Sequence, residues 1–113
     1  MTHKQYHDLI RSAMEAPTEE IFIAEPGFPD WLYEIYGEDC ATLLSDLRNV
    51  YEVANMTLPE MRKATGLTQE KFAQRFGIPK RSIENWEGEQ STPPQYVRLL
   101  IADALGFVKV QRI

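Results

Sequence analysis

Helix start and stop signals follow one another closely between residues 56 and 106, and they limit the fold more than any other feature of the sequence. A threonine with Glu or Gln three residues later has the spacing of a capping box, which satisfies backbone groups at a helix start. Proline suits a first helical turn because its φ is already helical, and glycine commonly ends a helix. The start signals are Thr57 with Glu60, Thr68, Pro79, and Thr92 with Gln95; the stop signals are Gly66, Gly77 and Gly106.

These signals predict three short helices and one longer one, namely residues 57–65, residues 68–76, a helix from Pro79, and residues 93–105. Two apolar pairs have hydrophobic-staple spacing, Met56 with Met61 and Leu67 with Phe72. Ile83 and Trp86 lie three apart, which places both on the inner face of the third helix. The residues expected to be buried in the last helix are Val97, Leu100, Ile101 and Ala104.

Three short helices with a tight glycine-containing turn before the third are the parts of a helix-turn-helix. In that motif the helix after the turn enters the major groove of DNA, and the helix before it crosses the backbone. Lys80, Arg81, Glu84 and Asn85 form the outer face near the start of the third helix. Arg and Lys suit guanine, Asn suits adenine, and Glu accepts from cytosine, so this face can read base edges.

The stretch from residue 57 to residue 94 resembles the Xre-like, lambda-repressor-like helix-turn-helix family, and with the following helix the resemblance covers residues 57–105. The matching positions lie in register along the segment. They are Gly66-Leu67-Thr68-Gln69 at the scaffold helix, Phe72-Ala73 within it, Gly77-Ile78 at the turn, Ser82-Ile83 and Trp86-Glu87 in the recognition helix, and Pro94 before the fourth helix. The resemblance implies a helical bundle that binds double-stranded DNA as a repressor-like transcriptional regulator.

The resemblance also implies roles for single residues. Gln69, at the start of the scaffold helix, would contact a phosphate or a base edge. The whole set of expected DNA-binding residues is Gln69, Lys80, Arg81, Ser82, Glu84 and Asn85. Arg62 and Glu87 match a pair that in the family joins the first helix to the end of the third, so we expect a structural ion pair there.

The segment departs from the family pattern in two places, and the second lowers the expected affinity for DNA. Pro79 stands where the family usually has a Ser or Thr cap, and the linker Gly88–Thr92 lacks Lys and Arg but contains Glu89. Residues 57–98 hold seven basic and five acidic side chains, a balance of only +2, and phosphate neutralisation supplies much of the affinity for DNA. We therefore expect a homodimer on a two-fold site, with half-sites about one helical turn (~34 Å) apart.

The segment before residue 56 has a helical pattern of its own. It predicts helices over residues 3–15 and 39–54, and a short helix after Asp30. Ile21, Phe22 and Ile23 favour a short strand, and the alternation of Val108 and Val110 favours a second strand that can pair with it. The expected fold is therefore mostly α, with a helix-turn-helix bundle, an N-terminal helical extension and two short β-strands. The expected divisions are residues 1–55, 56–106 and 107–113.

The formal charge of −5 is the sum of two unlike halves. Residues 1–55 hold three basic and 11 acidic side chains (−8), whereas residues 56–113 hold nine basic and six acidic ones (+3). The acidic half should face away from DNA, where it would supply dimer or partner contacts. This leaves an alternative function open, namely an antitoxin-type module whose N-terminal segment binds a toxin.

An aromatic group in the acidic half allows two interpretations: Phe22, Phe28, Trp31, Tyr33 and Tyr36. These residues form either a small core against the helix over 39–54 or a protein–protein surface, where Trp and Tyr are favoured anchors.

Other classes of protein are disfavoured. No apolar run approaches the roughly 18 residues of a membrane span, and the start of the chain has no signal-peptide pattern. Cys40 is the only cysteine, which suits a reducing cytoplasm. His3 and His7 lie four apart without a third ligand, so we expect no metal. We also expect no catalytic residues and no cofactor, because neither an acid–base pair nor a glycine-rich phosphate loop is visible.

Overall fold

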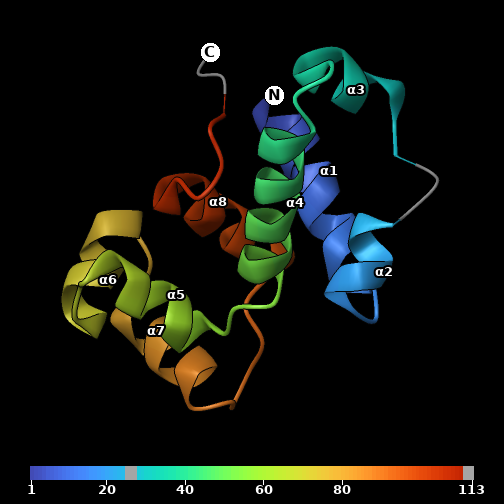
Figure 1. Ribbon diagram of the computed structural model, residues 1–113. Helices are drawn as coiled ribbons and strands as arrows, with labels where there is room; N and C mark the ends of the chain where they lie inside the picture. The colour runs from blue at the N-terminus through green and yellow to red at the C-terminus, as the bar shows by residue number, and fades with distance from the viewer. Residues whose placement is uncertain (25–27, 111–113) are drawn as a thin grey trace. The chain divides into compact units, whose positions relative to one another are not determined.

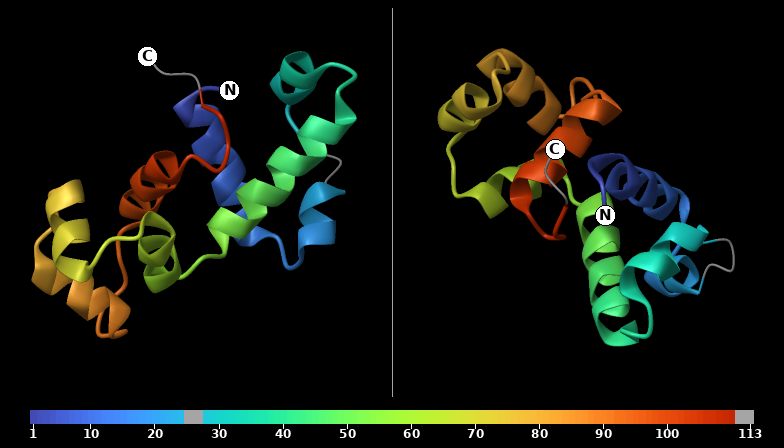
Figure 2. Two further views of the ribbon diagram at one scale, coloured as in Figure 1. Left: turned by 60° about the vertical axis from the view of Figure 1, so that its left-hand side comes forward. Right: turned by 90° about the horizontal axis from the view of Figure 1, so that it is seen from above.

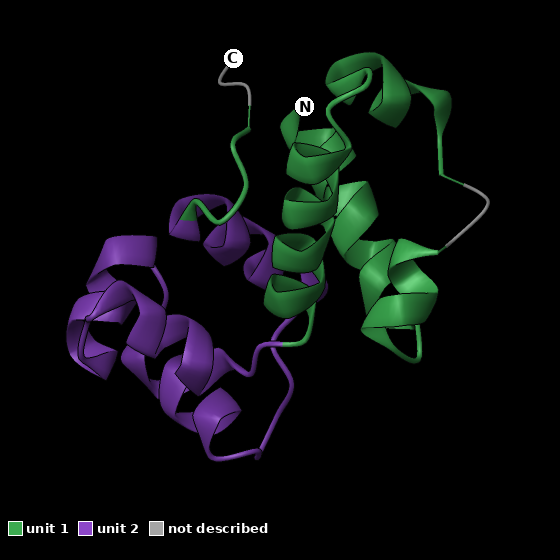
Figure 3. Ribbon diagram, in the orientation of Figure 1, with its two compact units in different colours: residues 1–55, 106–113 green, residues 56–105 purple. Residues whose placement is uncertain are grey.

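A computed structural model describes residues 1–24 and 28–110, which form eight α-helices and no strand (Figure 1). The helices are α1 (His3–Glu15), α2 (Glu19–Ile23), α3 (Asp30–Tyr36), α4 (Cys40–Ala54), α5 (Leu58–Thr65), α6 (Gln69–Phe76), α7 (Lys80–Glu87) and α8 (Gln95–Leu105). None of them is both long enough and apolar enough to span a membrane. The chain divides into two compact units, unit 1 (residues 1–55 and 106–113) and unit 2 (residues 56–105) (Figure 3).

Unit 1 is built around α4, on which α1, α2 and α3 pack (Figure 2). Thr2 and Gln5 form a capping box at the start of α1. The helices expected over residues 3–15 and 39–54, and the short helix after Asp30, are present. The buried side chains at the centre of the unit come from all four helices: Tyr6, Leu9, Ile10, Ala13, Phe22, Leu32, Leu47, Val50 and Val53.

The strand expected at residues 21–23 is wrong, because these residues belong to α2. The Thr18 hydroxyl accepts a hydrogen bond from the backbone N–H of Ile21 at 3.2 Å, which caps the helix. Glu19 and Glu20 occupy the first turn, where carboxylates interact favourably with the helix dipole. Strand propensity is a weak preference that depends on packing, and here the cap and the burial of Phe22 decide the conformation.

The second expected strand is not seen in residues 107–110, which have no regular secondary structure; the remainder of that prediction, residues 111–113, lies outside the described residues. This part of the tail belongs to unit 1. The side-chain amide of Asn49 on α4 donates to the carbonyl of Phe107 at 3.2 Å, and Val108 is buried. The tail is thus held by a side chain of α4 and not by a neighbouring strand.

Unit 2 contains α5 to α8. Thr57 and Glu60 form the predicted capping box of α5, and α6 packs against α7, while α5 packs against both α7 and α8. All four helices contribute buried side chains: Leu58, Met61, Phe72, Ala73, Ile83, Val97, Leu99, Ile101 and Ala102. The mostly helical part of the fold prediction is therefore confirmed.

Helix α8 differs in detail from the expectation. It begins at Gln95 and not at residue 93, because a residue before proline is pushed out of the helical region and Pro93 precedes Pro94. Val97 and Ile101 are buried as expected, but Leu100 is 55% exposed and Ala104 is also exposed. Leu99 and Ala102 are buried in their place.

The net charge of the part that resembles the helix-turn-helix family is smaller when it is counted over unit 2 alone. Residues 56–105 alone hold seven basic and six acidic side chains, a balance of +1. The balance of +3 for the C-terminal half includes Lys109, which lies in unit 1, and Arg112, which lies outside the described residues. Any attraction of unit 2 for phosphate therefore depends on where its few cations lie.

Candidate nucleic-acid interface

The turn between α6 and α7 is formed by Gly77, Ile78 and Pro79. Gly77 has φ +66° and ψ +32°, the left-handed conformation, which glycine adopts without the steric cost that a Cβ brings. The backbone N–H of Ile78 then donates to the carbonyl of Ala73 at 2.9 Å, which closes the end of α6. The turn reverses the chain within three residues, so α6 and α7 pack against each other.

Helix α7 has clearly different faces. Ile83 is fully buried in unit 2, whereas Lys80, Arg81 and Glu84 are exposed and Asn85 is half-buried. In a helix with 100° between residues, Arg81 and Asn85 lie about 160° from Ile83 and Glu84 lies about 100° from it, whereas Lys80 lies only about 60° from it, at the first residue of the helix. Arg81, Glu84 and Asn85 therefore lie on the side of α7 away from the core, and Lys80 is exposed at the start of the helix.

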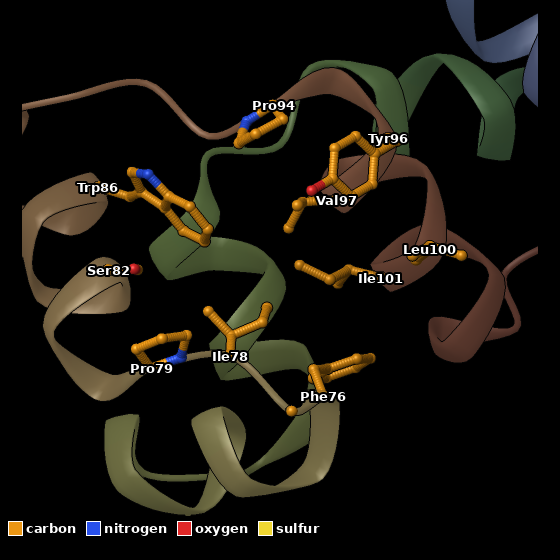
Figure 4. Close-up of a pocket in the computed structure, with 11 residues that line it drawn as sticks. Phe76, Ile78, Pro79, Ser82, Trp86, Pro94, Tyr96, Val97, Leu100 and Ile101 are labelled. Carbon is orange, nitrogen blue, oxygen red and sulfur yellow. The ribbon is translucent and has the colours of Figure 1, made fainter.

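Ser82 lies apart from that group. Together with Trp86, one turn further along, it lines a cavity of about 370 Å³ between α7, the end of α6 and α8 (Figure 4). Tyr96 and Leu100 of α8 line the same cavity and are 66% and 55% exposed. This apolar hollow was missed from the sequence, since the periodicity predicted that Leu100 was buried.

The start of α7 carries no side-chain cap, because Pro79 occupies the N-cap position and has no side-chain acceptor. The backbone N–H groups of a first helical turn point outward and attract anions. Lys80 and Arg81 add two positive charges at the same end. The departure from a Ser or Thr cap thus leaves this end of α7 suited to a phosphate.

Glu87 joins three elements at the other end of α7. Its carboxylate accepts two hydrogen bonds from the Arg62 guanidinium, from Nε at 2.8 Å and from Nη2 at 2.9 Å. A third bond comes from Nε2 of Gln69 at 3.3 Å. Arg62 also donates from Nη1 to the carbonyl of Leu67 at 3.1 Å. The ion pair therefore ties α5 to α7, and the same carboxylate holds Gln69 at the start of α6.

The electrostatics of this cluster follow from its contacts. The side chains of Arg62 and Glu87 are only 20% and 9% exposed, so water screens them weakly. The hydrogen bonds from Arg62 hold the pKa of Glu87 below its ordinary value, against the opposing effect of burial. The same bonds raise the pKa of Arg62. Glu87 is therefore ionised at neutral pH and is occupied by protein partners.

Two further cations lie on α6, and the sequence reasoning did not include them. Lys71 and Arg75 are both exposed, and the Arg75 guanidinium lies 5.6 Å from the centre of the Phe76 ring. Their four-residue spacing on the scaffold helix was the available signal, since i and i+4 share a helix face. With Lys80 and Arg81, they make four exposed cations on α6 and α7.

The linker after α7 is exposed from Gly88 to Thr92 and has no basic side chain. Glu89 has φ +60°, the only positive φ among the described residues other than glycine. The linker therefore offers no cation to a phosphate, as expected from the sequence.

Comparison with protein families gives a match between residues 60–113 and the family described as Helix-turn-helix. No curated protein and no solved structure matches the chain. The matched range includes α6, the turn at Gly77 and α7.

Proposed function

Because residues 60–113 belong to the Xre-like helix-turn-helix family, we propose that this protein is a DNA-binding transcriptional regulator that reads the major groove with α7. One observation carries the proposal: Arg81, Glu84 and Asn85 lie on the side of α7 away from the core and Lys80 is exposed at the helix start, while Ile83 is buried. A recognition helix needs this combination, because one face must be braced while the other contacts bases.

The proposed roles differ along α7. Arg81 and Asn85 point most directly away from the core and are the proposed base readers, for guanine and adenine respectively. Lys80 is the proposed phosphate contact at the helix start. Glu84 is proposed to disfavour base pairs that present no hydrogen-bond donor to its carboxylate. Ser82 lines the cavity, so its proposed position is at the edge of the DNA-binding surface of α7.

Gln69 has a proposed role that its neighbour restricts. Its Nε2 donates one of its two hydrogens to Glu87, which leaves a second N–H as a donor and Oε1 as an acceptor. The donor suits a phosphate, and the acceptor suits the amino group of adenine or cytosine. The proposed contact of Gln69 is therefore a phosphate or a base edge.

A homodimer remains part of the proposal. One reading helix contacts only a few base pairs, and two copies related by a two-fold axis read half-sites about one helical turn apart. The balance of +1 in residues 56–105 supports this, since few phosphate contacts by a single copy give low affinity.

The test measures how protein variants with single substitutions bind the DNA upstream of the protein's own gene. Arg81→Ala and Asn85→Ala should each weaken binding by about 1–3 kcal/mol and relax specificity at one base pair. Lys4→Ala is the matched control, because it removes a cation that is 85% exposed in unit 1. Unchanged affinity and specificity in both α7 variants would show that α7 does not contact DNA.

A second function is proposed for unit 1, that of an antitoxin-type module that binds a partner protein such as a toxin. It is supported by the acidic composition of residues 1–55 and by their packing into a unit separate from α5–α8. Co-expression with the product of an adjacent gene tests it. Joint purification and restored growth would support this role, whereas failure of both would contradict it.

A further inference from the structure

Unit 1 contains an apolar groove between α3 and α4. It has a volume of about 250 Å³ and is lined mainly by Ile23, Phe28, Tyr33, Cys40, Leu43 and Leu44. Tyr33 is 51% exposed and Leu44 is 36% exposed, although large apolar side chains are usually inside a small domain. We call this site the α3–α4 groove.

The walls of the α3–α4 groove are held in place by contacts within unit 1. The hydroxyl of Tyr36 on α3 donates to the carboxylate of Asp46 on α4 at 2.5 Å, and the pKa of Tyr36 is raised by burial and by this bond. Phe28 packs edge-on against the buried ring of Phe22, with 5.7 Å between ring centres. A groove that is already formed loses little conformational entropy when a ligand binds.

The part of the chain that lines the groove is strongly acidic. Residues 16–55 contain nine acidic side chains and one basic side chain, Arg48, and that cation lies 3.5 Å from Glu19. Exposed acidic residues flank the groove-lining positions along the chain: Asp30 and Glu34 on either side of Tyr33, and Glu38 and Asp39 immediately before Cys40. The surroundings therefore repel anions and attract cations.

We propose that the α3–α4 groove binds a positively charged amphipathic helix of a partner protein. Apolar side chains at i, i+3 and i+4 of such a helix would fill the groove, as in other helix-in-groove complexes, and its Lys and Arg side chains would face the acidic rim. A second copy of this chain would bring like charges together, and DNA would be repelled, so neither fits the rim. The inference rests on the second proposed function and is independent of DNA binding.

Cys40 makes the proposal directly measurable, because it is the only cysteine of the chain, is exposed, and lines the groove. The probe is a synthetic helical peptide with a leucine stripe and lysines elsewhere. One control peptide has the same composition in scrambled order, and a second carries glutamate in place of lysine. The readouts on the full chain are the alkylation rate of Cys40 and the affinity for the labelled peptide.

We expect the basic amphipathic peptide to slow Cys40 alkylation severalfold, while both control peptides leave the rate unchanged. Leu44→Lys should abolish the protection, whereas Leu100→Lys, the same change in unit 2, should retain it. Glu34→Gln with Glu38→Gln should weaken binding about three- to tenfold, since exposed charge pairs each contribute only modestly to affinity. Circular dichroism confirms that each variant is folded.

Several results would overturn the proposal. Equal protection by the scrambled or the acidic peptide would show that the groove does not select a basic apolar helix. Protection of Cys40 by increasing concentrations of the protein alone would make the surface an interface between copies. If Leu44→Lys bound the peptide as well as the wild type, the groove would not be the site. Joint purification with the product of an adjacent gene in a protein that does not bind the peptide would contradict the groove alone, whereas loss of both would contradict the partner function as well, so the two failures are distinguishable.

Discussion

Glu87 contacts side chains from two other helices with one carboxylate. Arg62 approaches it from α5 and Gln69 from α6. The pair of Arg62 and Glu87 was expected from the family resemblance, but the bond to Gln69 was not. A resemblance compares positions one at a time, whereas this bond depends on the rotation of α6 against α7, which no short pattern encodes.

Replacing Glu87 with Gln should lower the free energy of unfolding by about 2 kcal/mol. The substitution leaves the largely buried Arg62 guanidinium without its counter-charge, and breaking such a pair is costly. Urea denaturation measures the change. Glu84→Gln, on the exposed side of the same helix, should change stability by less than about 0.5 kcal/mol. Equal effects of the two substitutions would show that the ion pair does not stabilise unit 2.

The same residue predicts a pH dependence. The native pKa of Glu87 is lowered by Arg62, so its contribution is complete above the ordinary glutamate pKa of about 4.3. It is lost as the pH falls through the lower native pKa. The difference in unfolding free energy between the wild type and Glu87→Gln should therefore be constant near neutral pH and shrink in acid. A difference that grows on acidification would contradict this assignment.

At the scale of helices, local signals predicted most of the boundaries and failed where two signals competed. The capping box at Thr57 and the glycines after α5 and α6 are complete within a few residues, so the sequence alone locates them. In α2, β-branched residues suggested a strand, while Thr18 capped a helix. In α8, the capping-box spacing of Thr92 was overridden by two consecutive prolines.

Gly77→Ala should destabilise unit 2 by about 1 kcal/mol or more. A Cβ at Gly77 would meet no neighbouring atom within 4 Å, so the cost comes from its φ of +66° and not from a clash. Thermal unfolding measures it. Gln74→Ala, an exposed position of α6, is the control and should be near neutral, since Ala favours helices. Equal stability of Gly77→Ala and the wild type would show that the turn tolerates a side chain.

At the scale of the whole molecule, the negative charge belongs mainly to unit 1. The sequence predicted an acidic and a basic half, but it did not show that the tail with Lys109 joins the acidic unit. Within that unit, Asn49 donates a hydrogen bond to Phe107, which is 58 residues away in the sequence. Contacts at such separation leave no periodic pattern in the sequence.

The distribution of charge predicts a shallow salt dependence for DNA binding. Four exposed cations lie on α6 and α7, and each neutralised phosphate contributes about −0.9 to the slope of log K against log salt. The slope should therefore be no steeper than about −3.6 for each reading head. Binding measured over a series of salt concentrations gives the slope. A steeper one would mean that cations outside α6 and α7 contact DNA.

The most direct test of the central claim is a binding-site selection from random DNA at a fixed, stated salt concentration, with the wild type and Asn85→Ala in parallel. The wild type should select a two-fold symmetric site whose half-sites are about 10 base pairs apart. Asn85→Ala should select the same site with the preference for one base pair per half-site lost. Sequence recognition by α7 would be contradicted if the wild type selected no common DNA sequence. It would also be contradicted if both proteins selected identical sites.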